Sequence, residues 1–88
     1  MDSKLWYVYI LRCADNSLYT GVTIDVDKRL DEHNGIAKKG AKYTHGRRPV
    51  KLAYQESAGS RSEACKREYI IKNLNKSEKE TLIQKNKK

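Results

Sequence analysis

The sequence predicts a small α/β domain of the α+β type, in which a three-stranded, mostly antiparallel sheet is flanked by helices. Three observations predict this fold: an apolar and aromatic N-terminal run divided by a turn, a later run that alternates in hydrophobicity, and two helix-capping patterns near the C-terminus. The expected order is β-β-α-β-α-α. Because short βαβ crossovers cannot join all three strands, a mostly antiparallel sheet flanked by helices is the natural packing. With 88 residues the chain has room for one domain. We place it at residues 1–84 and expect the basic tail at 85–88 to be disordered.

The first two strands are predicted on either side of the turn "ADNS". Residues 4–13 are apolar, aromatic and β-branched in type, and residues 18–23 follow the turn, which is the pattern of a hairpin. Period-two alternation divides the first strand between two faces, with Trp6, Val8 and Ile10 on one and Tyr7, Tyr9 and Leu11 on the other. Because both faces carry apolar side chains, we expect helices on both sides of the sheet.

A short helix is predicted after the hairpin. Asp25 or Asp27 can cap it, it should run to about residue 34, and Gly35 supplies a stop. Arg29 and His33 lie one turn apart on the side of the apolar stripe, so both should face the sheet. That stripe consists of Val26, Leu30 and Ala37.

The C-terminal half predicts one strand and two helices. Residues 50–56, after Pro49, form a strand with Val50, Leu52 and Tyr54 on one face. Capping boxes at residues 60–63 and 77–80 open a helix to about residue 74 and a short last helix. The apolar stripe of the first of these helices consists of Ala64, Ile70, Ile71 and Leu74, with Glu68 at its edge.

Charge favours a polyanionic partner. Nineteen Lys and Arg against eleven Asp and Glu give a net charge of +8. The segment 38–51 contains no acid, and its Gly-containing, basic composition fits phosphate contact with base stacking. The candidate nucleic-acid-binding residues there are Lys38, Lys39, Lys42, Tyr43, Arg47 and Arg48.

Other classes of protein are disfavoured. No run approaches the roughly 18 apolar residues needed to span a bilayer, and no strongly apolar helix face accompanies the charge. We therefore expect no membrane association and a cytoplasmic location. Cys13 and Cys65 have no zinc-ligand spacing, so we expect two reduced, mostly buried thiols.

Five polar side chains could together cleave a phosphodiester: Tyr9, Tyr19, Arg29, His33 and Glu68. Such a reaction needs a base for water, positive charge on the phosphate oxygens and a Lewis acid at the leaving oxygen. Arg29 suits the second task, and Glu68 is a hard oxygen ligand of the kind Mg²⁺ prefers. Tyrosine is a poor base at neutral pH, but nearby cations favour the phenolate, and His33 could supply that charge or accept the proton.

Each residue also has a structural alternative. Glu68 has the spacing of an exposed ion pair with Lys72, and Arg29 can pair with Asp25 or Glu32. His33 can cap the end of its helix, and both tyrosines can be cross-strand packing residues. Residue types alone therefore leave the enzymatic assignment open.

The motif order supplies further information. Tyr7-Val8-Tyr9, then Tyr19-Thr20-Gly21, then Arg29 in the next helix and a glutamate in a later one resemble the GIY-YIG nuclease domain. The whole chain resembles its small stand-alone bacterial members, which implies the GIY-YIG endonuclease fold. The first triplet departs from Gly-Ile-Tyr, and Val22 stands where some members carry a lysine, so a cationic phosphate contact is missing or comes from Lys38, Lys42 or Arg47.

The resemblance implies roles by position. Tyr9 and Tyr19 match the motif tyrosines, one of which acts as general base, and Gly21 matches the glycine that lets the backbone pack closely. Arg29 matches the phosphate-stabilising arginine, His33 a position near the base, and Glu68 the ligand of one Mg²⁺ or Mn²⁺ ion. Asn73 matches a supporting polar residue more weakly.

These implications predict a metal-dependent endonuclease acting on DNA, including branched or single-stranded DNA, with DNA favoured over RNA. The alternative is a nucleic-acid-binding module that keeps the fold without cleaving, and a third reading is an adaptor bound to an acidic protein. Because the sequence shows no second domain, a partner protein could supply specificity.

Overall fold

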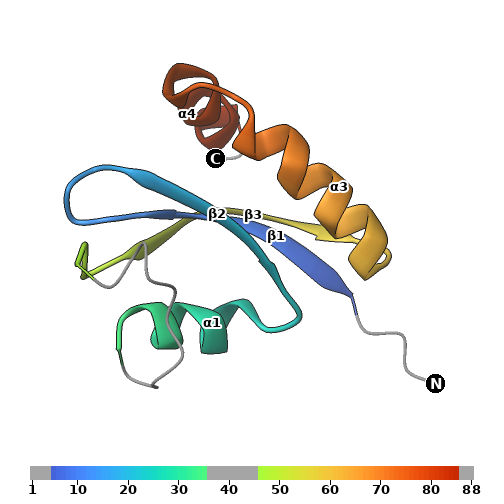
Figure 1. Cartoon of the computed structure of the whole chain (residues 1–88), viewed down its shortest axis with the longest axis horizontal. Coiled ribbons are helices and arrows are strands. Elements are labelled where there is room, and N and C mark those ends of the chain that lie inside the picture. The colour runs from blue at the N-terminus through green and yellow to red at the C-terminus, as the bar shows by residue number, and fades with distance from the viewer. Residues whose placement is uncertain (1–4, 36–45, 86–88) are drawn as a thin grey trace.

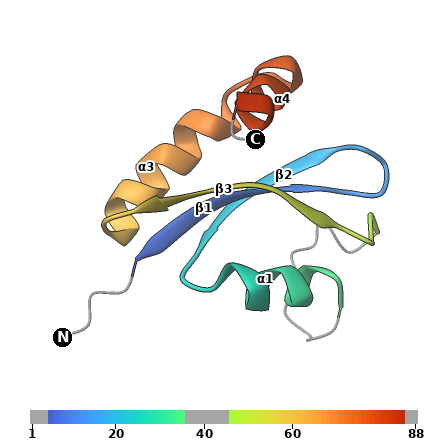
Figure 2. The same cartoon turned by 180° about the vertical axis from the view of Figure 1, so that it is seen from behind.

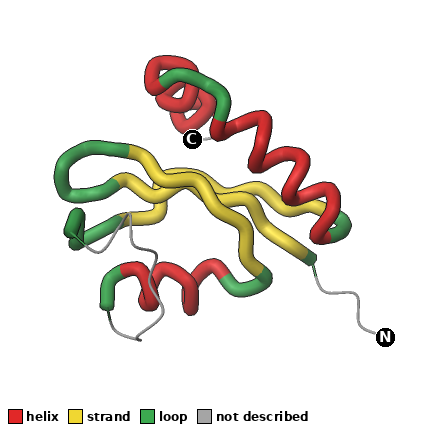
Figure 3. Tube along the Cα trace, in the orientation of Figure 1, coloured by secondary structure: helices red, strands yellow, loops and turns green. Residues whose placement is uncertain are grey.

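The computed structural model of the chain describes residues 5–35 and 46–85. The elements are β1 (Trp6–Arg12), β2 (Leu18–Thr23), α1 (Val26–His33), β3 (Lys51–Ala58), α3 (Arg61–Lys72) and α4 (Lys76–Lys85) (Figures 1 and 3). The predicted element order and α+β class are confirmed. Helix α4 reaches the first residue of the expected tail, and the rest of that tail lies outside the described residues. None of the described helices is long and apolar enough to cross a membrane.

The sheet has the strand order β2-β1-β3, and both pairings are antiparallel. Helix α1 covers one face, whereas α3 and α4 cover the other (Figures 1 and 2). The central strand β1 alternates between these layers as predicted. Val8 and Ile10 are buried toward α3 and α4, and Tyr9 and Leu11 are buried toward α1.

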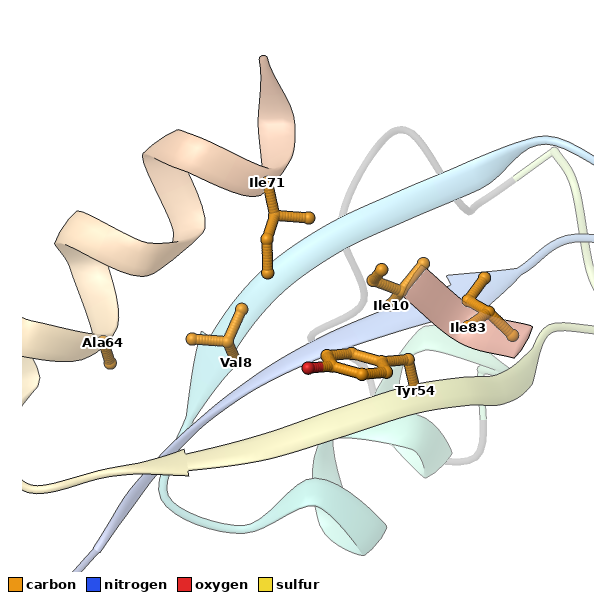
Figure 4. Close-up of a cluster of buried hydrophobic side chains, with 6 residues drawn as sticks. All are labelled: Val8, Ile10, Tyr54, Ala64, Ile71 and Ile83. Carbon is orange, nitrogen blue, oxygen red and sulfur yellow. The ribbon is translucent and has the colours of Figure 1, made fainter. Parts of the chain in front are cut away.

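The larger core cluster joins the sheet to the two C-terminal helices. Its buried members, shown in Figure 4, are Val8, Ile10, Tyr54, Ala64, Ile71 and Ile83. On the α1 face the buried members are Tyr9, Leu11, Cys13 and Val50. This second, smaller cluster includes Tyr9, so the α1 face of the core contains a polar phenol hydroxyl.

The predicted alternation of the third strand is wrong at one point. Between Ile10 and Leu11 the register shifts, so that Ile10 pairs with Tyr54 and Leu11 with Leu52. The extra residue on β3, Ala53, packs with the α3-side cluster. A β-bulge of this kind turns the strand over. Tyr54 therefore points toward α3, whereas Leu52 stays on the α1 side with Val50.

Two predictions for the C-terminal helices also need correction. Ile70 is 52% exposed, because the buried line of α3 runs from Ala64 to Ile71 and Ile70 lies about 100° around the helix from it. The capping box of α4 begins at Asn75, two residues before the expected serine. The Asn75 side chain accepts from the Glu78 amide at 2.8 Å, and the Asn75 amide donates to the Glu78 carboxylate at 2.9 Å.

Helix α1 is anchored at both ends, which fixes the residues on its inner side. At its start, the Asp25 carboxylate accepts from the Lys28 amide at 3.0 Å, as predicted for one of the two candidate caps. At its end, the Asn34 side chain accepts from the Val50 amide at 2.7 Å and donates to the Val50 carbonyl at 3.0 Å. These two bonds tie the helix to the segment that leads into β3. Ala37, expected in the apolar stripe, lies outside the described residues.

The chain leaves α1 through a turn that requires glycine. Gly35 has φ +85, a conformation that L side chains rarely adopt. A Cβ atom at this position would also lie 2.8 Å from an Arg48 guanidinium nitrogen. The predicted stop is therefore confirmed by backbone conformation alone, because the Arg48 guanidinium is the far end of a flexible side chain and could move aside.

The two thiols differ in burial. Cys13 is buried as expected, whereas Cys65 is only partly buried on α3. Both are free.

Candidate active site

The candidate site lies where β1 and β2 pair on the α1 face. Tyr9 and Gly21 are direct partners in the antiparallel register. A Cβ atom at Gly21 would lie 2.5 Å from the Tyr9 hydroxyl oxygen and 2.7 Å from its Cζ, so only glycine lets the ring cross this part of β2. The motif glycine therefore has a direct steric role, which is to make room for the phenol of the neighbouring strand.

His33, the last residue of α1, completes a group of three rings. It is 0% exposed, and its Nε2 lies 3.1 Å from the Tyr9 hydroxyl oxygen. Its ring centroid lies 6.0 Å from that of Tyr9 and 5.0 Å from that of Tyr19, and the two tyrosine centroids are 6.4 Å apart. The side chain thus faces the sheet rather than capping the helix, whose C-cap is Asn34.

Arg29 connects this group to an acid on its own helix. Its Nη1 donates to the Glu32 carboxylate at 2.7 Å, and the two side chains are 27% and 11% exposed. The guanidinium also hydrogen-bonds the Tyr9 hydroxyl. Because a guanidinium has five N–H donors in a planar fork, it can hold both partners at once. The sequence had offered Glu32 only as an alternative partner for Arg29. In the structure it is a buried member of the site.

Burial controls protonation in the cluster. It raises the pKa of Tyr9 to about 12, against a hydrogen bond and positive charge from Arg29 that lower it. Burial also lowers the pKa of His33 to about 4, and the charge of Arg29 acts in the same direction. At neutral pH both side chains are therefore neutral. Arg29 favours the Tyr9 phenolate, as expected of a nearby cation, but desolvation outweighs this effect.

Glu68 projects from α3, which covers the opposite face of the sheet. Its negative charge nevertheless contributes to the raised pKa of Tyr9. Its Oε2 is 3.2 Å from Lys72 Nζ, and its side chain is 21% exposed. The ion pair considered from the sequence is therefore formed.

A single half-buried carboxylate fits a Mg²⁺ or Mn²⁺ ion that keeps most of its shell as water and substrate oxygen. Within residues 5–35 and 46–85, no group of three or more His, Cys, Asp or Glu side chains is arranged to hold a metal ion. Glu68 would then be a lone protein ligand, as the motif resemblance implies. Lys72 would have to release the carboxylate for the ion to bind.

The other predicted residues lie outside the ring cluster. Asn73 is the C-cap of α3, and its side chain donates to the Tyr69 carbonyl at 2.7 Å. Arg47 pairs with Asp15 at 3.0 Å, and Arg48 donates to the His33 carbonyl at 2.7 Å. Roles for these two arginines in nucleic-acid binding stay predictions. The candidates Lys38, Lys39, Lys42 and Tyr43 fall outside the described residues.

The fold and the site define a domain of the nuclease type. The model of the GIY-YIG catalytic domain matches residues 5–81, and the chain belongs to that family. Within it, the chain is similar to UPF0213 proteins, which form a small GIY-YIG family. It is 54% identical over 82 residues to the one from Desulfotalea psychrophila, covering 93% of this chain and 74% of the relative. The UPF0213 protein of Halobacterium salinarum is 53% identical over 77 residues, with 88% and 97% covered.

Solved structures show the same fold. The solution NMR structure of a UPF0213 protein from Bacillus halodurans matches with a TM-score of 0.60 at 45% identity, covering 93% of this chain and 85% of the other. A protein from E. faecalis, also solved by NMR, matches with a TM-score of 0.63 at 36% identity, covering 96% and 88%. These matches agree with the three-stranded antiparallel sheet and its helices.

Proposed function

We propose that this protein is a metal-dependent endonuclease that hydrolyses phosphodiester bonds in DNA, including branched or single-stranded DNA. One observation carries the proposal: the buried contact between the Tyr9 hydroxyl and a neutral His33, beside Arg29, in a domain of a nuclease-type family. The net charge of +8 supports a polyanionic substrate. A cytoplasmic location, expected from the sequence, fits such a substrate and stays a prediction.

The Tyr9–His33 pair can accept the proton of the attacking water. In the tautomer with its proton on Nδ1, His33 accepts from the Tyr9 hydroxyl through Nε2. As the water oxygen bonds to phosphorus and the bond from phosphorus to the leaving oxygen breaks, the water proton passes to the Tyr9 oxygen while the phenol proton passes to His33. No free phenolate has to form, which suits a tyrosine whose pKa is raised to about 12. Tyr19 is half-buried and packs against the imidazole, with its ring centroid 5.0 Å from that of His33.

Arg29 supplies the positive charge for the non-bridging phosphate oxygens. In the structure this guanidinium already bridges Glu32 and the Tyr9 hydroxyl, so its orientation is set before substrate arrives. A preoriented charge at the reacting centre stabilises the transition state without reorganisation. Glu68 would hold the Mg²⁺ or Mn²⁺ ion, which when bound supplies a Lewis acid for the leaving oxygen.

A second candidate is a nucleic-acid-binding module with little activity of its own. The observation that favours it is that both ionic groups of the site have partners on their own helices. Arg29 contacts Glu32 at 2.7 Å and Glu68 contacts Lys72 at 3.2 Å. In such a protein these pairs would persist on DNA, and a partner protein would supply either the cleavage or the specificity.

A nicking assay separates the two candidates. Supercoiled, single-stranded and branched DNA would be incubated with Mg²⁺ or Mn²⁺, and in parallel with EDTA. We expect metal-dependent cleavage that is lost in Glu68→Gln and Arg29→Ala, while binding to DNA in EDTA survives. The matched control is Asp31→Asn, which removes one negative charge from an exposed position of α1. Binding without turnover on every substrate would overturn the endonuclease and favour the module.

A further inference from the structure

A hollow of about 240 Å³ opens beside Arg29. Its lining residues belong to the end of β2, to α1 and to the connection between them, whose course Figure 1 shows. They are Thr23, Ile24, Asp25, Lys28, Arg29 and Glu32. Two cations at successive positions of one helix thus line the same hollow. From the sequence, a role is expected only for the second of them, Arg29.

The carboxylates of the hollow are already engaged. The Asp25 carboxylate caps α1 by accepting from the Lys28 backbone amide at 3.0 Å, and Glu32 holds Arg29 at 2.7 Å. Lys28 is exposed, and within residues 5–35 and 46–85 no ion pair to its ammonium is formed. The Lys28 ammonium therefore has no ion pair within residues 5–35 and 46–85, while the Asp25 carboxylate, which accepts from a neutral amide, keeps its negative charge at the same hollow.

The Lys28 ammonium can replace a cation that the chain lacks at position 22. Val22 stands where some members of the family carry a lysine, and its side chain is packed toward α3 and α4. Arg47, one of the suggested substitutes, is drawn into an ion pair with Asp15 at 3.0 Å. Among the residues that the structure describes, Lys28 lines the same hollow as Arg29.

We infer that Lys28 binds the backbone phosphate adjoining the one held by Arg29, with the Thr23–Asp25 turn forming the floor of this second phosphate subsite. The inference rests on the proposed function for the identity of the ligand, a nucleic-acid strand. The turn is closed by a hydrogen bond from the Asp25 amide to the Thr23 hydroxyl at 3.2 Å, which holds the hydroxyl at the hollow. Because Lys28 contacts a phosphate that does not react, it contributes to binding and leaves the chemical step unchanged.

Salt-dependent binding tests the inference directly. Binding of a labelled single-stranded oligonucleotide would be measured in EDTA over a series of salt concentrations for the wild type, Lys28→Gln and Lys28→Arg. Each phosphate contact contributes about 0.7 to the slope of log K against log salt for a single strand. We expect Lys28→Gln to reduce the magnitude of the slope by about 0.7 and Lys28→Arg to retain it. In the cleavage assay Lys28→Gln should raise KM and leave kcat unchanged.

Lys66→Gln is the matched control, because Lys66 is an exposed lysine of α3, on the other side of the sheet (Figure 2). An equal loss of slope in Lys66→Gln would overturn the inference, because it would show a general effect of net charge. An unchanged slope in Lys28→Gln would overturn it alone, whereas a wild-type slope near zero would overturn the proposed function as well. Salt-dependent binding without cleavage would refute the endonuclease, while the slope difference still decides the role of Lys28.

Discussion

Replacing Tyr9 with phenylalanine removes one hydroxyl and leaves the ring, so it isolates the contact at the centre of the cluster. The hydroxyl oxygen lies 3.1 Å from His33 Nε2, and the two residues are 2% and 0% exposed. In Tyr9→Phe the imidazole nitrogen of His33 loses this partner, although the residue itself is 0% exposed. A buried polar group left unsatisfied costs about 1–3 kcal/mol. We expect the variant to lose about 1–2 kcal/mol of unfolding free energy, which corresponds to about 5–15 °C in Tm.

Urea unfolding followed by circular dichroism measures this loss, with Tyr7→Phe as the matched control. Tyr7 lies on the same strand and is half-buried, so its hydroxyl should contribute less than about 0.5 kcal/mol. Equal stability of the two variants would refute the buried hydrogen bond. In the nicking assay, Tyr9→Phe should slow turnover by about 10²–10⁴-fold if its hydroxyl carries the proton. Wild-type turnover in this variant would refute that role.

Three further predictions concern the same cluster. The pKa of His33 is about 4 in the folded protein and 6.5 in the unfolded chain, so the buried neutral imidazole contributes about 3 kcal/mol to the free energy of unfolding above pH 6.5. This contribution is lost as the pH falls toward 4, which urea titrations at several pH values would detect. Gly21→Ala should destabilise the fold by about 1–3 kcal/mol and abolish nicking, whereas Gly46→Ala, whose Cβ would meet nothing within 4 Å, should do neither. Glu32→Ala should lower kcat by about 10–100-fold by releasing Arg29, with partial recovery in Glu32→Gln, and an unaltered kcat would refute the positioning role.

Much of the fold could be predicted because local signals and burial agree. Local residue types predict three features of the fold. Alternating apolar side chains predict the two faces of β1, an aspartate predicts the helix cap at Asp25, and a glycine predicts the positive φ at Gly35. The bulge in β3 could not be predicted, because nothing in the alternation of residues 50–56 shows where the partner strand shifts its register. The exposure of Ile70 likewise depends on how α3 is rotated over the sheet.

The candidate site residues could be selected from motif spacing together with the family resemblance, but their protonation could not be predicted. Cations near Tyr9 are visible in the sequence and argue for a low pKa, whereas the desolvation that raises it depends on packing between β1, β2 and α1. The same burial lowers the pKa of His33, so its imidazole is neutral. It also places Glu32 where its carboxylate holds Arg29. A signal for Glu32 was present in its i,i+3 spacing from the arginine. Its burial is what distinguishes it from an ordinary surface partner.

Because β1 lies at the centre of the sheet, the sheet should stay folded under conditions in which the candidate site no longer holds together. The backbone of β1 is hydrogen-bonded on both sides, so its amides should exchange with solvent only when the domain opens as a whole. Helix α1 has 8 residues and carries both Arg29 and His33, and we expect it to detach at a lower free energy than the sheet despite its anchors. Tyr9 would then remain in an intact sheet without its partners. On warming, the domain should therefore pass through a state that is still folded in its core but no longer competent for cleavage.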